Sequence, residues 1–565
     1  MKPLLAPLFS SALTKLGIEA GEVGFSDPPD AALGDYATNI AMIAAKKLGK
    51  NPMDLAAEIV AALPDNPVIV KAEPMKPGFI NVTVNPEQLL AYFAEHQEEK
   101  PQFGQGKTVV TDTSHPNIAK PMGIHHLLST VIGAAINETL AYCGYKVVKD
   151  NFLGDWGTQY GKLIYAYKTW GDPAVVEKDP IPELLKLYVK FHDEAEKDAT
   201  IEDAGRAEFA KMEQGDKENL ALWKQMRDLS LAEFQKTYDR LEVTFDVMNS
   251  EGFYEDKMPE IIELGKKKGV FTEGEKGALV CKFPDEVLPT CVIVKGDGST
   301  MYHTRDLART KYWDSEYHAD VMMICTDMAQ DLHFKQLFMM AEMLGLTTAQ
   351  NVHVSFGRMQ FADRKMSTRK GNILPLDEVL EEAVDRARTL LEEKRSELPE
   401  EEKTKLAETI GIGSVKYAIL SQNRTTNVTF DWDKIISLEG NSAPYLQYTY
   451  ARGRSVLQKA KNEKGFQEGA LEIRNLELEI PERAVLLHLI AFPEAVAKSA
   501  AEYRPNVIAN HLYALAQKFN HFYNTTPILD ADPAERDLRL KMTSSVCTML
   551  QLGLGLLGIK VPERM

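Results

Sequence analysis

The chain has few cysteines, and their spacing matches no metal-binding or disulfide pattern. Five cysteines are scattered over 565 residues, with no CxxC pair and no Cys/His cluster at zinc spacing. This odd, dispersed set argues against a disulfide framework and favours buried or surface thiols in a reducing compartment. We therefore expect a cytoplasmic protein without a structural metal.

Long apolar runs and a surplus of basic charge are also missing. No apolar run reaches the roughly 18–20 residues that a membrane helix needs, and MKPLLAPLFSSALTKLG lacks the basic region and cleavage site of an export signal. We expect no membrane partner. The net charge of −17 argues against a general nucleic-acid binder. It still allows recognition of one particular RNA through a local basic groove.

An α/β pattern begins near residue 107. The apolar, β-branched run KTVVTDT (107–113) predicts a buried strand, and a turn-rich HPNIAKP leads into a helix over about 123–142. GYKVVKDN (144–151) and GDWGTQYGKLIYAYKTW (154–170) predict a second strand and helix. This order indicates a parallel sheet with right-handed crossovers, and ligands bind such sheets at the carboxyl ends of the strands.

The segments around this pattern differ in character. Helical periodicity and a short strand (78–84) predict a small α+β domain at the N-terminus, and charged helical sequence predicts an insertion at about 172–290. The α/β pattern returns at LPTCVIVK (288–295), and from 376 onward the chain reads as nearly all helical. The expected fold is a multidomain α/β protein with an all-α C-terminal domain. The expected domains are 1–104, 105–375, a helical connection 376–430, and 431–565.

Two loops hold candidate chemistry. A helix that follows a parallel strand points its N-terminal N–H groups at the ligand edge, which suits a phosphate. The side chains expected at that position are Lys120, His125, His126, Ser129 and Thr130. Adjacent histidines at a helix start are more often structural than catalytic, so this loop needs a partner. DRKMSTRKGN (363–372) carries cations that could meet a transferring phosphate. Without context a solvated basic loop would be the better interpretation, but the position after the predicted strand VHVSFG (352–357) argues against it.

Together the two loops resemble the HIGH and KMSK signatures of class I aminoacyl-tRNA synthetases. Further segments resemble the arginyl-tRNA synthetase family and occur in its order: GDYATN (34–39), PGFINV (77–82), HPNIAKP (115–121), GDWGTQYG (154–161), GDGSTMYHTRD (296–306), QDLHFKQ (330–336), FDWDKIISLEGNSAPYLQYTYARGRS (430–455) and the terminal LGIKVPERM. Each match is weak alone, but the ordered set is specific. It implies a Rossmann-type catalytic domain and, as substrates, ATP with Mg²⁺ as counter-ion, L-arginine and tRNA(Arg).

The resemblance also implies roles for individual residues. Catalysis in such enzymes rests on positioning and electrostatic stabilisation of the transferring phosphate. The catalytic residues implied are His126, Lys120 and Lys365. The ATP-binding residues implied are Gly123, His125, His126, Ser129, Lys365, Met366 and Ser367. A guanidinium needs a carboxylate and neutral acceptors, and the arginine-binding residues implied are Asn117, Tyr302, Asp306 and Gln330. The alternative for Asp306 is an ion pair with Arg305 or Arg309.

Two terminal regions are implied to bind tRNA. The N-terminal domain resembles the module that reads the tRNA elbow, where Phe79 could stack on a base and Asn81 could bond its edge. The C-terminal domain resembles the anticodon binder, with Tyr445, Tyr448 and Arg452 as stacking or phosphate contacts. Core packing is the alternative for each aromatic residue. We expect a monomer.

The first signature departs from its family. It reads GIHH, so Gly123 replaces the first histidine and His125 replaces the glycine on which adenine lies. Either His125 supplies the missing imidazole, or the chain is a degenerate synthetase that only binds tRNA or regulates. A class I ligase for another amino acid is a third possibility, although Tyr302 and Asp306 favour a cationic substrate.

Overall fold

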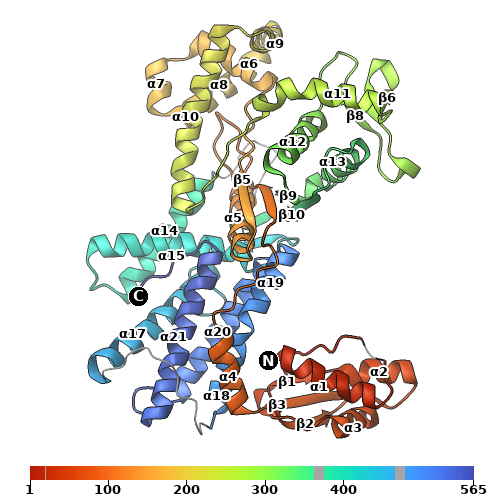
Figure 1. Cartoon of the computed structure of the whole chain (residues 1–565). Helices are drawn as coiled ribbons and strands as arrows, with labels where there is room; N and C mark the ends of the chain where they lie inside the picture. The colour runs from red at the N-terminus through yellow and green to blue at the C-terminus, as the bar shows by residue number, and fades with distance from the viewer. Residues whose placement is uncertain (20, 362–374, 465–476) are drawn as a thin grey trace.

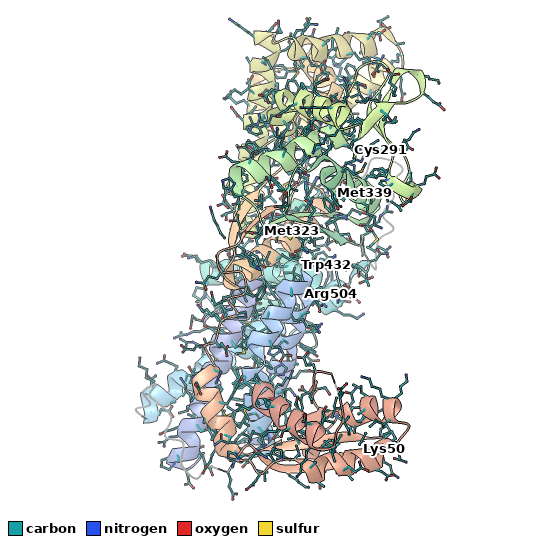
Figure 2. The ribbon with its side chains drawn as sticks, turned by 45° about the vertical axis from the view of Figure 1, so that its right-hand side comes forward. Lys50, Cys291, Met323, Met339, Trp432 and Arg504 are labelled. Atoms are coloured by element: carbon teal, nitrogen blue, oxygen red, sulfur yellow. The ribbon has the colours of Figure 1, made fainter. Side chains whose placement is uncertain are left out.

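The computed structural model describes residues 1–19, 21–361, 375–464 and 477–565 and shows an elongated molecule (Figure 1). A helical insertion lies at one end, followed by a parallel sheet with its helices, a helical bundle, and the N-terminal domain beside the bundle. In Figure 2, Met323 lies within the sheet region and Lys50 lies far away in the N-terminal domain. The sheet is therefore separated from the N-terminal domain by the bundle.

Four parallel strands in the order β10-β9-β4-β5 form the central sheet. Their bounds are β4 (Thr108–Asp112), β5 (Lys146–Asp150), β9 (Val321–Asp327) and β10 (Gln350–Phe356). Helix α5 (Ile124–Tyr142) follows β4, and α13 (Asp331–Leu344) follows β9. Helices shield the sheet, which is why the apolar sequence of β9 is buried almost throughout. The predicted parallel sheet is confirmed.

The strand order places a topological switch point between β4 and β9. From β4 the chain crosses to β5 on one side, and β9 later pairs with the other side of β4. Crossovers on opposite sides leave a crevice between the loops that follow these two strands, outside their carboxyl ends. The segments after Asp112 and Asp327 therefore meet where a ligand is expected.

One strand predicted for this sheet belongs elsewhere. LPTCVIVK contains β8 (Cys291–Val294), which pairs antiparallel with β7 (Leu279–Cys281) in a separate sheet with β6 (Phe271–Glu273). The expectation that the parallel pattern resumes there is wrong. Val292 is 38% exposed between buried neighbours, and such alternation is typical of an antiparallel strand with one solvated face.

Helices form the insertion between β5 and this small sheet. Their bounds are α6 (Thr158–Trp170), α7 (Pro173–Lys178), α8 (Pro180–Ala195), α9 (Thr200–Glu213), α10 (Lys217–Leu241), the 3-10 helix η2 (Glu251–Lys257) and α11 (Met258–Lys267). Asp172 and Asp216 cap α7 and α10 by accepting backbone N–H bonds at 2.9 Å. Leu184, Phe191 and Met212 pack in a core of their own. The chain returns toward the central sheet through α12 (Tyr302–Tyr317).

The C-terminal third is helical apart from β12 (Val428–Phe430), which pairs parallel with β11 (Met359–Phe361). Its helices are α14 (Leu376–Lys394), α15 (Glu400–Leu420), α16 (Trp432–Ile435), α17 (Ala443–Lys464), α18 (Ile480–Ile490), α19 (Phe492–Glu502), α20 (Asn506–Thr525) and α21 (Pro533–Leu556). Leu512, Leu515 and Phe519 recur at helical spacing and are fully buried. Residues Ile480–Glu502 are long and apolar enough to cross a membrane, but here they form two helices of the bundle.

The N-terminal domain is an antiparallel sheet with helices. Its elements are α1 (Lys2–Lys15), β1 (Tyr36–Thr38), α2 (Ile40–Leu48), α3 (Pro52–Ala62), β2 (Ile69–Met75), β3 (Phe79–Val84) and α4 (Pro86–His96), with β3 between β1 and β2. The buried Asp35 carboxylate accepts from Arg483 of α18, 2.9 Å from Nε to Oδ1, and from the Val84 N–H. This charged pair joins the domain to the bundle.

Candidate active site

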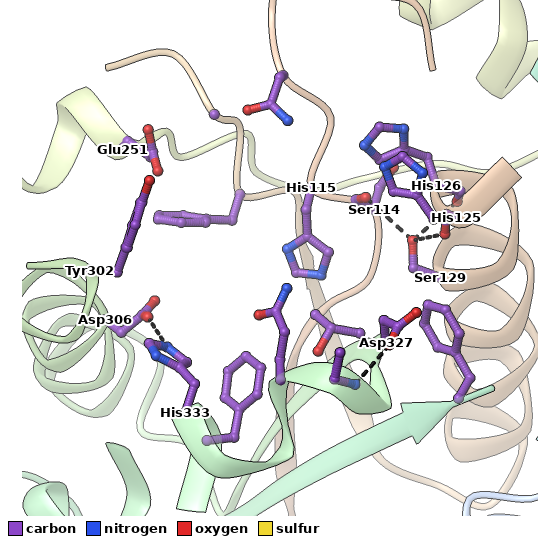
Figure 3. Close-up of a pocket in the computed structure, with 18 of the residues that line it drawn as sticks. Ser114, His115, His125, His126, Ser129, Glu251, Tyr302, Asp306, Asp327 and His333 are labelled. Carbon is purple, nitrogen blue, oxygen red and sulfur yellow. Dashed lines mark hydrogen bonds and ion pairs between the residues drawn. The ribbon is translucent and has the colours of Figure 1, made fainter. Parts of the chain in front are cut away.

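A cavity of about 540 Å³ opens at the switch point. Its wall comes from the loops after β4 and β9, the start of α5, and the starts of α12 and η2 (Figure 3). The residues around it that were also assigned from the sequence are Asn117, His125, His126, Ser129, Tyr302, Asp306 and Gln330. Segments that lie more than two hundred positions apart in the chain, such as those of Asn117 and Gln330, thus meet at one place.

The start of α5 is one end of the cavity. The Gly123 N–H donates to His126 Nδ1 at 2.9 Å, so a neutral His126 ring carries its proton on Nε2. Burial, with His125 and His115 nearby, holds the pKa of His126 well below its usual value. His126 is therefore a neutral hydrogen-bond donor beside a helix N-terminus, where an anion is stabilised.

His125 occupies a different environment from His126. It is exposed, although the two ring centroids lie only 3.8 Å apart. The Ser129 hydroxyl lies 3.1 Å from the His126 carbonyl, so it fixes the first turn of the helix. Thr130, expected at the same place, is fully buried with its hydroxyl 2.9 Å from that of Ser114. Gly123 is buried and does not line the cavity.

The opposite end of the cavity is acidic. Asp306, 8% exposed, has one carboxylate oxygen 3.0 Å from Arg309 Nη2 and the other 2.7 Å from His333 Nε2. Tyr302 is 68% exposed and projects into the same space (Figure 3). Of the two ion pairs considered from the sequence, the one with Arg309 is formed. Arg305 pairs instead with Glu251, at 3.4 Å, and with Glu255.

Glu251 was not predicted as a site residue. This residue starts η2 and presents a carboxylate to the cavity, facing Tyr302 in Figure 3. Burial raises the pKa of Glu251 to about 7, although Arg305 opposes that shift. A second carboxylate thus stands close to Asp306. It belongs to no motif, so only the folded chain reveals it.

His115 was also unassigned, and it lies in the centre of the cavity view (Figure 3). Its Nδ1 is 3.1 Å from Asp112 Oδ2, and its Nε2 is 3.1 Å from the Cys325 carbonyl oxygen. Asp112 also accepts from Arg309 at 2.5 Å. His115, Asp112, Arg309, Asp306 and His333 therefore form one chain of polar contacts along the cavity wall.

Asn117 depends on a neighbouring glycine for its position. A Cβ at Gly154 would lie 2.2 Å from Asn117 Oδ1, closer than atoms can approach, so only glycine fits beside this amide. Gln330 precedes α13 and is exposed at the end of β9. Both amides border the space between the two ends of the cavity.

The remaining predicted catalytic residues lie elsewhere. Lys120 Nζ is 3.2 Å from Gln159 Oε1 and 4.9 Å from the Tyr188 ring, so it faces the insertion. Burial there lowers the pKa of Lys120. Lys365, Met366 and Ser367 lie outside the described residues.

The predicted tRNA contacts are far from the cavity. Arg452 of α17 lies over the rings of Tyr448, at 4.9 Å, and Tyr523, at 5.0 Å, and it donates to Asn520 Oδ1 at 2.6 Å. Tyr445 accepts from the same Asn520 at 3.0 Å. Phe79 is half-buried at the start of β3, and Asn81 is 5% exposed within that strand. Tyr523 and Asn520 complete a cluster that the sequence did not indicate.

A parallel sheet with a cavity at its switch point, a GIHH helix start and a separate helical bundle are features of a class I aminoacyl-tRNA synthetase. The family described as "tRNA synthetases class I (R), catalytic domain" matches residues 88–432. The arginyl tRNA synthetase N terminal domain matches residues 4–84, and the DALR anticodon binding domain matches residues 446–565.

Individual proteins give the same result. The arginine–tRNA ligase of Fusobacterium nucleatum is 43% identical, with 94% of this chain and 93% of that protein aligned. That of Clostridium perfringens is 38% identical over 95% of each chain. The structure of Thermus thermophilus arginyl-tRNA synthetase superposes with a TM-score of 0.83 and 25% identity, covering 100% of both chains. The chain belongs to the arginyl-tRNA synthetase family, as the sequence motifs predicted.

Proposed function

We propose that this chain ligates L-arginine to tRNA(Arg) at the expense of ATP. The arginine carboxylate attacks the α-phosphate of ATP, forming arginyl-adenylate and releasing pyrophosphate. The arginyl group then passes to the terminal ribose of the tRNA and AMP leaves. The observation that carries this proposal is a single cavity with buried carboxylates at one end and a helix N-terminus with His126 at the other.

We assign the acidic end to the guanidinium of arginine. Asp306 supplies the carboxylate, and Tyr302 and Glu251 stand close enough to contact the same group. A guanidinium is a planar fork of five donors, so several oxygens in one region suit it better than an ammonium. Asn117 and Gln330, between the two ends, would hold the α-amino group.

We assign the start of α5 to the phosphates of ATP. His126 would donate from Nε2 to the charge that develops on the α-phosphate, and the helix N-terminus would add to it. His125 at the cavity edge would supply the imidazole that Gly123 cannot, and Ser129 would hold the first turn. Lys120 would reach the phosphates by leaving the Tyr188 ring, and Lys365, Met366 and Ser367 would close over ATP.

Mg²⁺ would enter as the counter-ion of ATP. The described part of the chain contains no group of three or more His, Cys, Asp or Glu side chains placed to hold a metal. The phosphates of ATP and water molecules would provide ligands, as is usual for this ion.

The terminal regions would bind tRNA. We propose an elbow-binding domain at 1–104 with Phe79 and Asn81, a catalytic domain at 105–375 and a connection at 376–430. The anticodon-binding domain would span 431–565, with Tyr445, Tyr448 and Arg452. The exposed face of Tyr448 beside Arg452 suits a base next to a phosphate. We further propose a cytoplasmic monomer.

One assay separates this function from its alternatives. The purified chain, incubated with ATP, total tRNA and each standard amino acid, should charge tRNA with arginine alone. Pyrophosphate exchange should also be measured with tRNA present. No exchange under any condition would support a degenerate tRNA binder, and charging with another amino acid would reassign the substrate. Nothing in the described residues favours either alternative.

A further inference from the structure

Both oxygens of the Asp306 carboxylate have protein partners in this structure. Arg309 Nη2 is 3.0 Å from Oδ1 and His333 Nε2 is 2.7 Å from Oδ2. Figure 3 shows His333 extending from α13 toward Asp306 on α12. The side chains of Asp306 and His333 are 11% and 22% exposed, so water screens this pair only partly. A guanidinium that enters must share this carboxylate with them.

The Arg309 partner does not neutralise Asp306 fully. The same guanidinium lies 2.5 Å from Asp112 Oδ2, so its charge is divided between two carboxylates. Glu251 and Glu255 likewise share Arg305. Asp306 and Asp112 thus share one arginine, and this surplus of negative charge attracts a cationic substrate. A proton on His333 would reduce that surplus at the atom where the substrate binds.

The hydrogen bond from His333 exists in either charge state, because Nε2–H is a donor in the neutral ring and in the imidazolium. The two states of the ring differ only in charge. Neutral His333 therefore orients the carboxylate and leaves its charge available. Protonated His333 supplies a competing cation 2.7 Å from the carboxylate oxygen.

We propose that His333 is a positioning residue of the arginine pocket that, when neutral, directs the Asp306 carboxylate toward the substrate guanidinium and, when protonated, competes with it. This inference rests on the proposed function, since it takes arginine as the ligand of Asp306. It assigns His333 a role in substrate affinity rather than in the transfer of the phosphate.

Several other groups face this pair. Burial lowers the pKa of His303, whose ring lies 4.1 Å from that of His333, to about 4, and raises the pKa of Cys291 to about 12. Both groups are therefore neutral between pH 6 and 8. Glu251, whose pKa is raised to about 7 by burial, can change charge in that window. A test must therefore separate His333 from Glu251.

The test compares Glu251→Gln with the double variant Glu251→Gln, His333→Gln. Glutamine places an amide N–H where Nε2 stands but cannot gain a proton. KM for arginine and kcat for tRNA charging are measured from pH 6 to pH 8 at saturating ATP and tRNA. We expect KM in the Glu251→Gln single variant to rise about threefold or more from pH 8 to pH 6, with little change in kcat. The double variant should lose most of that rise.

His333→Ala provides the structural comparison. It removes the donor, and we expect a larger increase in KM for arginine at pH 8 than His333→Gln causes, since Asp306 loses its orientation. An equal rise of KM toward pH 6 in the single and double variants would overturn the proposal. A wild-type chain that fails to charge tRNA with arginine at pH 8 would instead overturn the proposed function, and this inference with it.

Discussion

The two ends of the cavity differ in how closely they follow their family. The acidic end keeps the YHTRD segment, and its Asp306 carboxylate contacts Arg309 and His333. The phosphate end has Gly123 and His125 exchanged relative to HIGH, yet His126 keeps its hydrogen bond to the helix start. We propose that the helix start and the His126 imidazole preserve the phosphate site although its sequence signature has changed.

The largest effect is expected from His126→Ala. The change removes the His126 ring, which we assign to the phosphates of ATP, and leaves the Gly123 N–H without its acceptor. Loss of one such donor typically lowers the rate about 10²- to 10³-fold. Pyrophosphate exchange with tRNA present would measure it. His126→Gln, which can still donate and accept, should lose less, and exchange at the wild-type rate by His126→Ala would refute the role given to this ring.

Asp306→Asn should weaken the binding of arginine at the acidic end of the cavity. We expect KM for arginine to rise about 100-fold, because a buried charged partner of the guanidinium becomes neutral. KM for ATP should stay nearly unchanged, which separates the two ends. Asp297→Asn, at an exposed carboxylate that binds only its own turn, is the matched control and should leave both constants unaltered. Equal rises in both constants for Asp306→Asn would show that the ends are not distinct.

Gly154→Ala should have a smaller effect at the middle of the cavity. The new methyl would meet the Asn117 amide at 2.2 Å and push it from its place. We expect about a tenfold rise in KM for arginine, measured in the charging assay. Gly555→Ala is the control because a Cβ there meets nothing within 4 Å. Unchanged arginine kinetics in Gly154→Ala would argue that Asn117 does not touch the substrate.

The smallest effect is expected from His125→Gly, which restores the family's glycine. His125 is exposed, and the glycine would clear backbone for the adenine ring. We expect KM for ATP to stay within about threefold of wild type, since His126 and the helix start remain. A fall in the rate of pyrophosphate exchange as large as that caused by His126→Ala would mean that His125 carries the phosphate contact alone.

Local features of this fold could be predicted from the sequence, and distant pairings could not. The run KTVVTDT predicted β4, and the turn before GIHH predicted the start of α5. Both predictions succeeded because each feature depends on neighbouring residues. LPTCVIVK was predicted to belong to the parallel sheet, but it pairs with β7 in the small antiparallel sheet. The sequence of a strand does not determine which strand it pairs with. IVKAEPM (69–75) was not recognised as β2 because its proline is tolerated only at a sheet edge.

The candidate site divides in the same way. Motifs placed Asn117, His126, Tyr302, Asp306 and Gln330 around one cavity. Glu251 and the contact of His333 with Asp306 were missed, because both depend on elements that come together only in the folded chain. Lys120 shows the converse, since this residue of the motif faces the insertion and not the cavity.

The central claim is that the acidic end of this cavity selects arginine for transfer to tRNA. Its most direct test is aminoacylation of total tRNA by the purified chain with labelled arginine, run beside Asp306→Asn and with the other standard amino acids as competitors. We predict that the wild type forms arginyl-tRNA, that no competitor reduces this, and that Asp306→Asn forms it only at about 100-fold higher arginine. Charging that is equal in the two proteins, or absent from the wild type, would contradict the account.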